Sequence, residues 1–157
     1  MSLNKEGNHY SIPHNDFHGL NDDDNNPGLK RKRSDTKVKL GGAFPDCVKI
    51  IKHLLNHKFA GPFVTPVDPV ALQIPDYLDV IKNPMDLGTV EDKLLHGEYE
   101  NVDEMADDVN LVWFNCEMYN GKDHDIVKMA KTLKKIFDKF YNQLKTKSFE
   151  ENDGNYF

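Results

Sequence analysis

The chain has 157 residues, a net charge of −6, a hydrophobic fraction of 38% and a mean hydropathy of −0.67. This length fits one ordinary domain with an extension, and the low hydropathy indicates that part of the chain is solvated. No apolar run approaches the ~18 residues that a membrane span needs, and the N-terminus lacks the apolar core of a signal peptide. Cys47 and Cys116 lie far apart on apolar stretches, which favours a reducing compartment and a soluble intracellular protein.

Residues 1–42 are predicted to form a disordered polar tail. Asn, Asp, Gly, His and Ser dominate this segment, so little apolar surface is available to offset the entropy of ordering it. It also carries a short basic run, which consists of Lys30, Arg31, Lys32 and Arg33. We interpret this run as a nuclear localisation signal, with a solubilising run of charge as the alternative.

A first helix is predicted from Phe44, because apolar residues recur at three- and four-residue steps as far as Leu55. The segment from Phe59 to Pro84 follows and holds five prolines, which exclude a long helix because proline fixes φ and removes a backbone donor. The same segment is rich in apolar and aromatic side chains. A loop this long and this hydrophobic is a liability unless it packs down. We therefore predict that it forms the wall of a pocket.

Two further helices carry start and stop signals. Asp86 is a predicted N-cap for a helix that ends at Gly97. Asn101 is a predicted N-cap for the next helix, whose apolar stripe is broken by Asn120 and Gly121. Both segments are amphipathic, which predicts that one side of each is buried.

The last helix is predicted from about Asp125 to Leu144, with its lysines mostly outward, and residues 148–157 are predicted to form a flexible C-terminal end. Four amphipathic helices without a convincing strand predict an all-α bundle.

Charge is unevenly distributed along the chain. Between Pro62 and Asp125 there are fifteen Asp or Glu residues and three lysines, a local balance of 3 − 15 = −12. The net charge argues against DNA as the principal partner, and an acidic middle flanked by basic ends favours a cationic partner. The alternative is a solvated acidic face that only keeps the domain soluble.

Several short motifs occur in a fixed order between Gly61 and Leu144. They are Pro62-Phe63, Pro66-Val67-Asp68, Ile74-Pro75-Asp76-Tyr77, the run from Ile81 to Thr89, and the run from Asn115 to Asn120. In this order they resemble the bromodomain family. The Pro-Val-Asp segment and the pair Asp125-Ile126 before the last helix are most similar to the BET type. The resemblance implies a left-handed four-helix bundle over residues 43–147, with a long proline-rich loop between its first and second helices. It also implies recognition of acetyl-lysine without catalysis.

The resemblance implies roles for individual residues. Asn120 would donate its side-chain amide hydrogen to the acetyl carbonyl, and Tyr77 would hold a water bonded to the same oxygen. The remaining implied contacts are Val67, Leu72 and Ile74 as one wall, Ile126 as the opposing gatekeeper, Phe63 beside the acetyl methyl, Pro62 in the same motif, and Tyr119 next to Asn120. The implied partners are acetylated lysine peptides, expected on histone tails, with no cofactor, and the implied location is the nucleus.

Elementary chemistry agrees with this interpretation. Acetylation turns an ammonium, which can only donate, into a neutral amide with an acceptor oxygen. Asn120 offers a donor to that oxygen, and apolar walls make it costly to bury an uncompensated charge. Without the resemblance, Asn120 and Gly121 would be a helix C-cap and the wall residues ordinary loop packing. A cap does not explain why the proline-rich loop stays so apolar.

One position departs from the family. Gly61 stands where bromodomains commonly have a tryptophan before Pro-Phe. The resemblance therefore implies a lower and wider hydrophobic shelf at the pocket rim, with a changed ligand preference there.

Parts of the sequence are compatible with two other classes of function. A helical nucleic-acid-binding domain would use the basic run and the lysines of the last helix. A metal hydrolase would use His53 and His57, which have the four-residue spacing of a zinc site but lack the intervening glutamate base and a third ligand. The acidic run from Asp22 resembles a calcium loop, but its twelfth position is Arg33 where a bidentate Glu is required. No metal site is expected.

Overall fold

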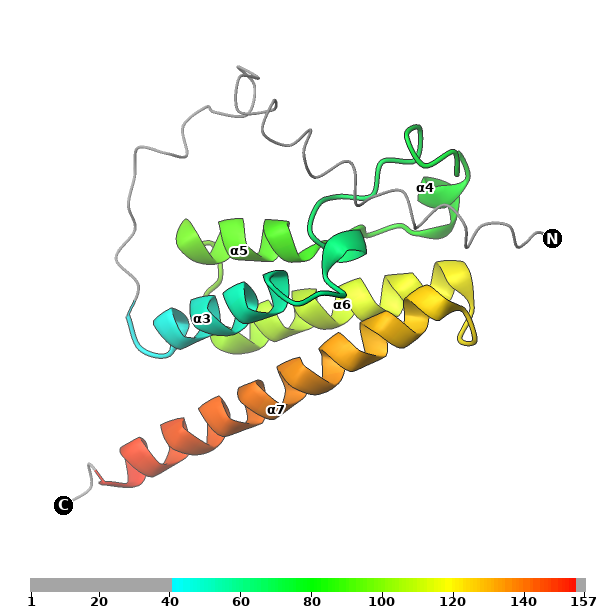
Figure 1. The fold of residues 1–157 in the computed structure, drawn as a ribbon. Helices are drawn as coiled ribbons and strands as arrows, with labels where there is room; N and C mark the ends of the chain where they lie inside the picture. Colours follow the sequence, from blue (N-terminus) through cyan, green and yellow to red (C-terminus); the bar gives the residue numbers. More distant parts are fainter. Residues whose placement is uncertain (1–40, 155–157) are drawn as a thin grey trace.

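The computed structural model describes residues 41–154. Its elements are α3 (Phe44–Leu55), the 3₁₀ helix η2 (Gly61–Phe63), α4 (Tyr77–Val80), α5 (Leu87–Leu95), α6 (Val102–Asn120) and α7 (Asp125–Gly154). The described residues contain no strand. Figure 1 shows α3, α5, α6 and α7 side by side as a bundle, with α4 and its loop next to the end where α6 joins α7. The predicted all-α bundle is confirmed. Residues 1–40 of the predicted tail, which include its basic run, lie outside the described residues.

The bundle is held by the apolar stripe of each long helix. Helix α3 packs on α5 and α7, and α6 packs on α5 and α7. The largest fully buried side chains come from all four helices, and they include Ile51, Leu94, Met105, Leu133 and Phe137. Because interiors pack at crystal-like density, these side chains fix how the helices lie against one another.

Local signals set where the helices begin and end. The Asp86 carboxylate accepts from the backbone N–H of Thr89 at 2.9 Å, and Asn101 Oδ1 accepts from Glu104 N at 2.9 Å. Both are side-chain N-caps, as predicted. Gly121 ends α6 with φ of +90°, a region that favours glycine.

The last helix is longer than predicted. Its apolar stripe ends at Leu144, yet α7 continues to Gly154. The intervening stretch contains no proline or glycine, so nothing in its backbone stops the helix. Residues 148–154, which the sequence placed in a flexible end, therefore belong to this helix.

The loop between α3 and α5 is tied down at two places. Gly88 N donates to Val64 O at 3.0 Å, and a Cβ at position 88 would lie 2.3 Å from that oxygen, so only glycine fits. Farther along, Asn115 of α6 is buried and its Nδ2 donates to Asn83 O at 2.8 Å. Each bond joins the loop to a bundle helix.

The loop also has a small core of its own. Leu72, Ile74, Tyr77 and Ile81 are buried together, with Val67 and Tyr119 packed against them. Gln73 lies between two of these residues with φ of +60°, a conformation that non-glycine residues rarely adopt. The left-handed residue reverses the chain locally, so that both of its neighbours are buried.

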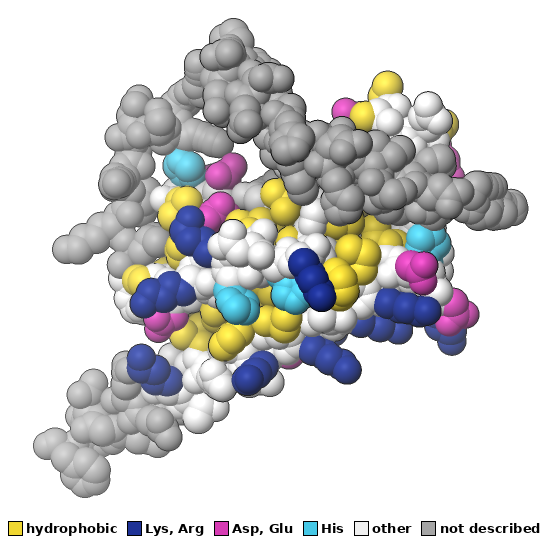
Figure 2. All heavy atoms as spheres, viewed as in Figure 1, with side chains coloured by type: hydrophobic (Ala, Val, Ile, Leu, Met, Phe, Trp, Pro, Cys, Tyr) yellow, Lys and Arg dark blue, Asp and Glu magenta, His cyan; other side chains and the backbone are white. Residues whose placement is uncertain are grey.

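Charged side chains cover the outer side of the bundle. Figure 2 shows lysine side chains gathered over α7, where the sequence predicted that they would face outward. In the C-terminal half of α7, Tyr141 Oη and Lys145 Nζ both donate to the carboxylate of Asp103 in α6, the lysine at 2.9 Å. The hydrogen bond from Tyr141, followed by that from Lys145, lowers the pKa of the Asp103 carboxyl. Among the described residues, no helix is both long and apolar enough to cross a membrane.

Candidate functional site

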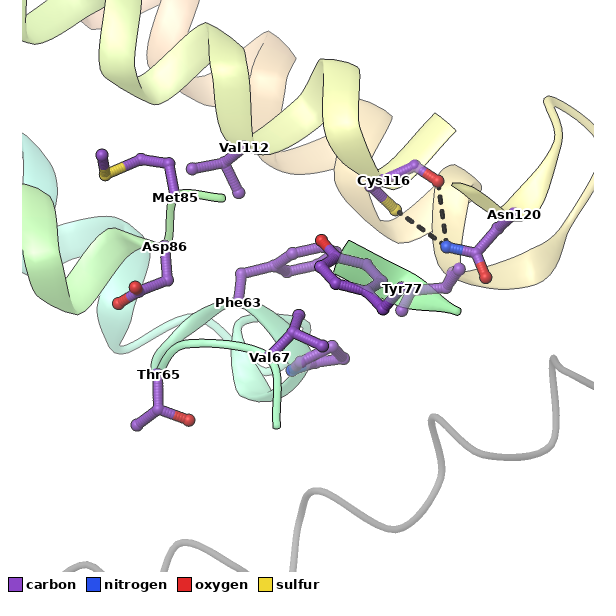
Figure 3. Close-up of a pocket in the computed structure, with 11 residues that line it drawn as sticks. Phe63, Thr65, Val67, Tyr77, Met85, Asp86, Val112, Cys116 and Asn120 are labelled. Atoms are coloured by element: carbon purple, nitrogen blue, oxygen red, sulfur yellow. Dashed lines mark hydrogen bonds between the residues drawn. The ribbon is translucent and has the colours of Figure 1, made fainter. Parts of the chain in front are cut away.

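A pocket lies where the loop meets the end of α6 and the start of α7. Its empty space amounts to about 340 Å³ when the open solvent at its mouth is included, and about 20 Å³ of it can hold the centre of a water molecule. Its lining consists of Pro62, Phe63, Thr65, Val67, Tyr77, Met85, Asp86, Val112, Cys116, Asn120 and Ile126. Figure 3 shows Asn120 at one end and Met85, Asp86 and Val112 at the other, with Phe63 and Tyr77 between them. The walls are mostly apolar with few polar groups, which is typical of a small-ligand site.

Asn120 is the last residue of α6, and its side chain has a fixed orientation. Its Nδ2 donates to the backbone oxygen of Cys116 at 2.9 Å and lies 3.9 Å from Cys116 Sγ (Figure 3). The following Gly121 turns the chain away, so the helix ends with this amide at the pocket wall. A primary amide nitrogen carries two N–H donors, so a bond to the helix is compatible with a second one to a ligand.

Tyr77 forms the wall next to Asn120. It begins α4, is buried, and stands edge-on to the Tyr119 ring, with ring centroids 4.9 Å apart. Burial raises the pKa of the Tyr77 hydroxyl to about 12, so the group stays a neutral donor at physiological pH. Burial likewise raises the pKa of the Cys116 thiol to about 12. The thiolate is therefore disfavoured, and Cys116 acts as a small apolar wall residue.

Two residues close the pocket from opposite sides. Phe63 of η2 is buried and meets the Trp113 ring edge-on, with centroids 5.6 Å apart. Ile126 lies in the first turn of α7, where its N–H donates to His124 Nδ1 at 3.1 Å. The loop and the helix start are thus each fixed by a contact outside the pocket.

The predicted site residues fall into two groups. Those that line the pocket are Pro62, Phe63, Val67, Tyr77, Asn120 and Ile126. Leu72 and Ile74 lie behind the wall, in the small loop core with Tyr77. Tyr119 packs against Tyr77 and donates from its hydroxyl to Asp76 Oδ1 at 2.7 Å. Gly61 begins η2, directly before Pro62 of the lining.

Five lining residues were not predicted as part of a site. They are Thr65, Met85, Asp86, Val112 and Cys116. A signal existed for two of them, because Cys116 and Val112 lie four and eight residues before Asn120 and therefore share its helix face. For Thr65 and Met85 the sequence offered none.

Asp86 is a buried carboxylate at the far end of the pocket. Both oxygens accept from Thr89, one from its backbone N–H at 2.9 Å and one from its hydroxyl at 2.7 Å. Burial raises the pKa of this carboxyl, while the Thr89 hydrogen bonds oppose the shift. Because it caps α5, this carboxylate is committed to the fold.

The histidines of the metal alternative have other contacts. His53 places its ring edge-on to Phe140, and His57 Nδ1 accepts from Phe59 N at 3.0 Å. Within the part of the chain that the structure describes, no group of three or more His, Cys, Asp or Glu residues could hold a metal ion.

The fold and the site together define a helical binding module with an apolar pocket and one fixed amide at its wall. The profile of the bromodomain family matches residues 47–132. This is more than half of the chain, and the chain belongs to the bromodomain family.

Three relatives support the assignment. Bromodomain-containing factor 2 of Saccharomyces cerevisiae is 44% identical over 98 residues, covering 60% of this chain and 15% of that protein. The SWR1 complex bromodomain subunit bdf1 of Schizosaccharomyces pombe is 44% identical over 98 residues, covering 62% of this chain and 17% of that protein. Bromodomain-containing factor 1 of Candida albicans is 45% identical over 96 residues, covering 59% of this chain and 13% of that protein. The matched region thus spans less than a fifth of each relative.

The predicted class of function is confirmed by this membership. The chain is an acetyl-lysine recognition module, and readers of this family are generally not enzymes. Nothing in the comparisons favours the nucleic-acid-binding alternative.

Proposed function

We propose that the pocket binds the acetylated lysine side chain and that Asn120 donates to its acetyl oxygen. The observation that carries this is the amide of Asn120, which is fixed by the Cys116 carbonyl at the wall of an otherwise apolar pocket. In this arrangement Tyr77 holds a water that bonds the same oxygen. Phe63 and Val67 enclose the acetyl methyl, and Ile126 closes the pocket over the aliphatic stem.

Discrimination against unmodified lysine follows from the same residues. An ammonium has three donors and no acceptor, so the Asn120 amide nitrogen cannot bond it. The one carboxylate in the lining, Asp86, already accepts twice from Thr89. A charged lysine would lose its hydration without gaining a partner, which costs several kcal/mol. The pocket therefore selects the acetylated side chain, and we propose that the domain binds it without transforming it.

The decisive experiment is calorimetry with Asn120→Ala and with acetylated and unmodified peptides. Losing a buried hydrogen bond of this kind costs about 1–3 kcal/mol, roughly 5- to 150-fold in Kd. Asn120→Asp is a second variant of nearly the same size, and as a carboxylate it can only accept, so it should lose binding as well. Asn142→Ala, on the exposed surface of α7, is the matched control and should bind normally. Unchanged affinity in folded Asn120→Ala would contradict the assignment.

We propose acetylated histone tails as the ligand peptides. Exposed carboxylates lie along the loop between α3 and α5 and at the connection that leads into α7. They are Asp68, Asp76, Asp79, Asp123 and Asp125. They would attract the cationic residues that flank an acetylated lysine in a basic tail. Association should therefore slow as ionic strength rises, and a peptide with neutral flanks should lose this dependence. Equal salt dependence for both peptides would argue against histone tails.

We propose further that residues 43–147 form the complete reader module and that the protein acts in the nucleus. The basic run from Lys30 to Arg33 would serve nuclear import, not peptide binding. A chain that starts at Gly41 should keep the peptide affinity of the whole chain. Neutralising the four basic residues should lower nuclear accumulation of a fluorescent fusion without changing that affinity.

A further inference from the structure

A second apolar surface lies between α6 and α7, away from the pocket. This α6/α7 groove is lined by Asn110, Trp113, Phe114, Glu117, Val127, Ala130, Lys131 and Lys134. It shares no lining residue with the acetyl-lysine pocket. The two helices are joined by a short connection and run back along each other (Figure 1), so both walls are rigid.

The groove has an apolar floor and an apolar projection on one wall. Val127 and Ala130 are almost fully buried at its base, and the small alanine leaves room above it. Phe114 is 58% exposed on the α6 wall, and Met118, one turn farther on, is 51% exposed. Single exposed apolar residues are ordinary, but two adjoining large ones beside an apolar groove form a continuous patch.

The two walls carry opposite charges. Glu117 on α6 and Lys131 on α7 are both exposed. Within the described part of the chain, neither side chain takes part in an ion pair, whereas Lys134 pairs with Asp138 at 2.8 Å and Lys128 with Asp125 at 3.7 Å. Among the described residues, the groove thus has one acidic side chain outside any ion pair on its α6 edge, Glu117, and one such basic side chain on its α7 edge, Lys131.

We propose that a second copy of this chain docks on the α6/α7 groove, about a two-fold axis that runs along it. Such a rotation lays α6 of each copy over α7 of the other at the same height. Phe114 then enters the groove of the second copy above its Ala130, and Glu117 faces the second copy's Lys131. The symmetry repeats both contacts, as in every isologous interface.

A second copy fits this face better than an unrelated partner does. The α6 wall of the groove carries the projecting Phe114 ring and the acidic Glu117. The α7 wall carries the space above Ala130 and the basic Lys131. A face with these features complements itself when rotated, which a two-fold dimer requires. The dimer leaves both acetyl-lysine pockets outside the interface, so two acetylated sites could be bound together.

Charge reversal tests the pairing directly. Glu117→Lys alone places lysine against lysine at both contacts, and Lys131→Glu alone places glutamate against glutamate. In an equimolar mixture, a heterodimer of these two variants restores both opposite-charge contacts. The measurement is sedimentation equilibrium from about 10 µM to about 1 mM, the range of weak association.

We expect the mass of the wild-type chain to rise from 18.0 kDa towards twice that value with concentration. Each charge variant should dissociate at least about tenfold more readily, and the mixture should recover association. Phe114→Ser should remain monomeric while keeping its melting temperature and peptide affinity. A wild-type chain that stays monomeric overturns the proposal, as does a mixture that associates no better than its components. Because monomers can still bind acetylated peptide, this outcome is independent of the proposed function.

Discussion

The helical bundle and the loop between α3 and α5 are stabilised in different ways. In the bundle, apolar side chains from four helices fill a common core, so each contact is supported by many others. The loop has only a small core of its own, and single contacts tie it to the bundle, such as Gly88 N to Val64 O at 3.0 Å and Asn115 Nδ2 to Asn83 O at 2.8 Å. Loss of one such bond leaves a buried polar group without a partner.

This difference bears on function, because the pocket is built from both regions. Asn120 and Ile126 come from the ends of bundle helices, whereas Phe63, Val67 and Tyr77 come from the loop. The bundle fixes where the hydrogen-bond donor lies, and the loop determines the shape of the cavity around the ligand. Changes in the bundle should therefore act mainly on stability, and changes in the loop mainly on binding.

The largest expected effect is Leu133→Ala in the bundle. Leu133 is fully buried, and removing such a side chain leaves a cavity that lowers the free energy of unfolding by about 2–5 kcal/mol. Leu78→Ala in α4 is the matched control, because that leucine is 53% exposed, and it should cost less than about 0.5 kcal/mol. Urea unfolding measures both. A similar loss from the two variants would contradict the distinction between bundle and loop.

Next comes Asn115→Ala, which removes a loop anchor. Its amide donates to Asn83 O from a buried position, so about 1–3 kcal/mol of stability should be lost. The loss should fall on the loop: amide hydrogen exchange should accelerate at residues 62–84 more than in α6, and acetylated peptide should bind more weakly. Asn110→Ala, exposed on the same helix, should change neither quantity. Uniform acceleration along the chain would show that Asn115 merely supports the core.

The helices could be predicted because their signals are local. Periodic apolar residues marked each stripe, and Asp86 and Asn101 cap the helices that they were predicted to cap. Helix α4 was not predicted, because it depends on contacts distant in sequence, such as that between Tyr77 and Tyr119. The end of α7 was placed at Leu144 because apolar periodicity stops there, although a helix can continue without burying a face.

The site was predicted less completely, for a related reason. A helical stripe does not distinguish a residue that faces the core from one that faces a pocket, so Cys116 and Val112 were not recognised as lining residues. Leu72 and Ile74 show the same ambiguity in the loop, since apolar character does not separate lining a wall from supporting it. Their contact with ligand stays a prediction.

A smaller effect is expected from Gly61→Trp at the loop rim. An indole laid over a bulky ligand would bury on the order of 50–100 Å² of apolar surface, about 1–2.5 kcal/mol before the cost of ordering the ring. Gly61 is not among the glycines with positive φ, so its backbone can accept a larger residue. An aromatic acetyl-lysine mimic should gain severalfold in affinity and a plain acetylated peptide little. Gly61→Ala is the control, and equal gains for both ligands would place position 61 away from the rim.

The smallest effect on stability is expected when glutamine is replaced by glycine, once in the loop and once in the bundle. Gln73 in the loop has φ of +60°, which costs a non-glycine residue about 1–2 kcal/mol. Glycine removes that strain but loses about 0.5–1 kcal/mol of chain entropy, so Gln73→Gly should leave stability unchanged or raise it by up to about 1.5 kcal/mol. Gln143, exposed in α7, has no such strain, and Gln143→Gly should cost about 1 kcal/mol. Unfolding in urea compares the two variants directly. If both variants lose the same amount of stability, the backbone of Gln73 is not strained, and replacing glutamine by glycine costs as much in the loop as in the helix.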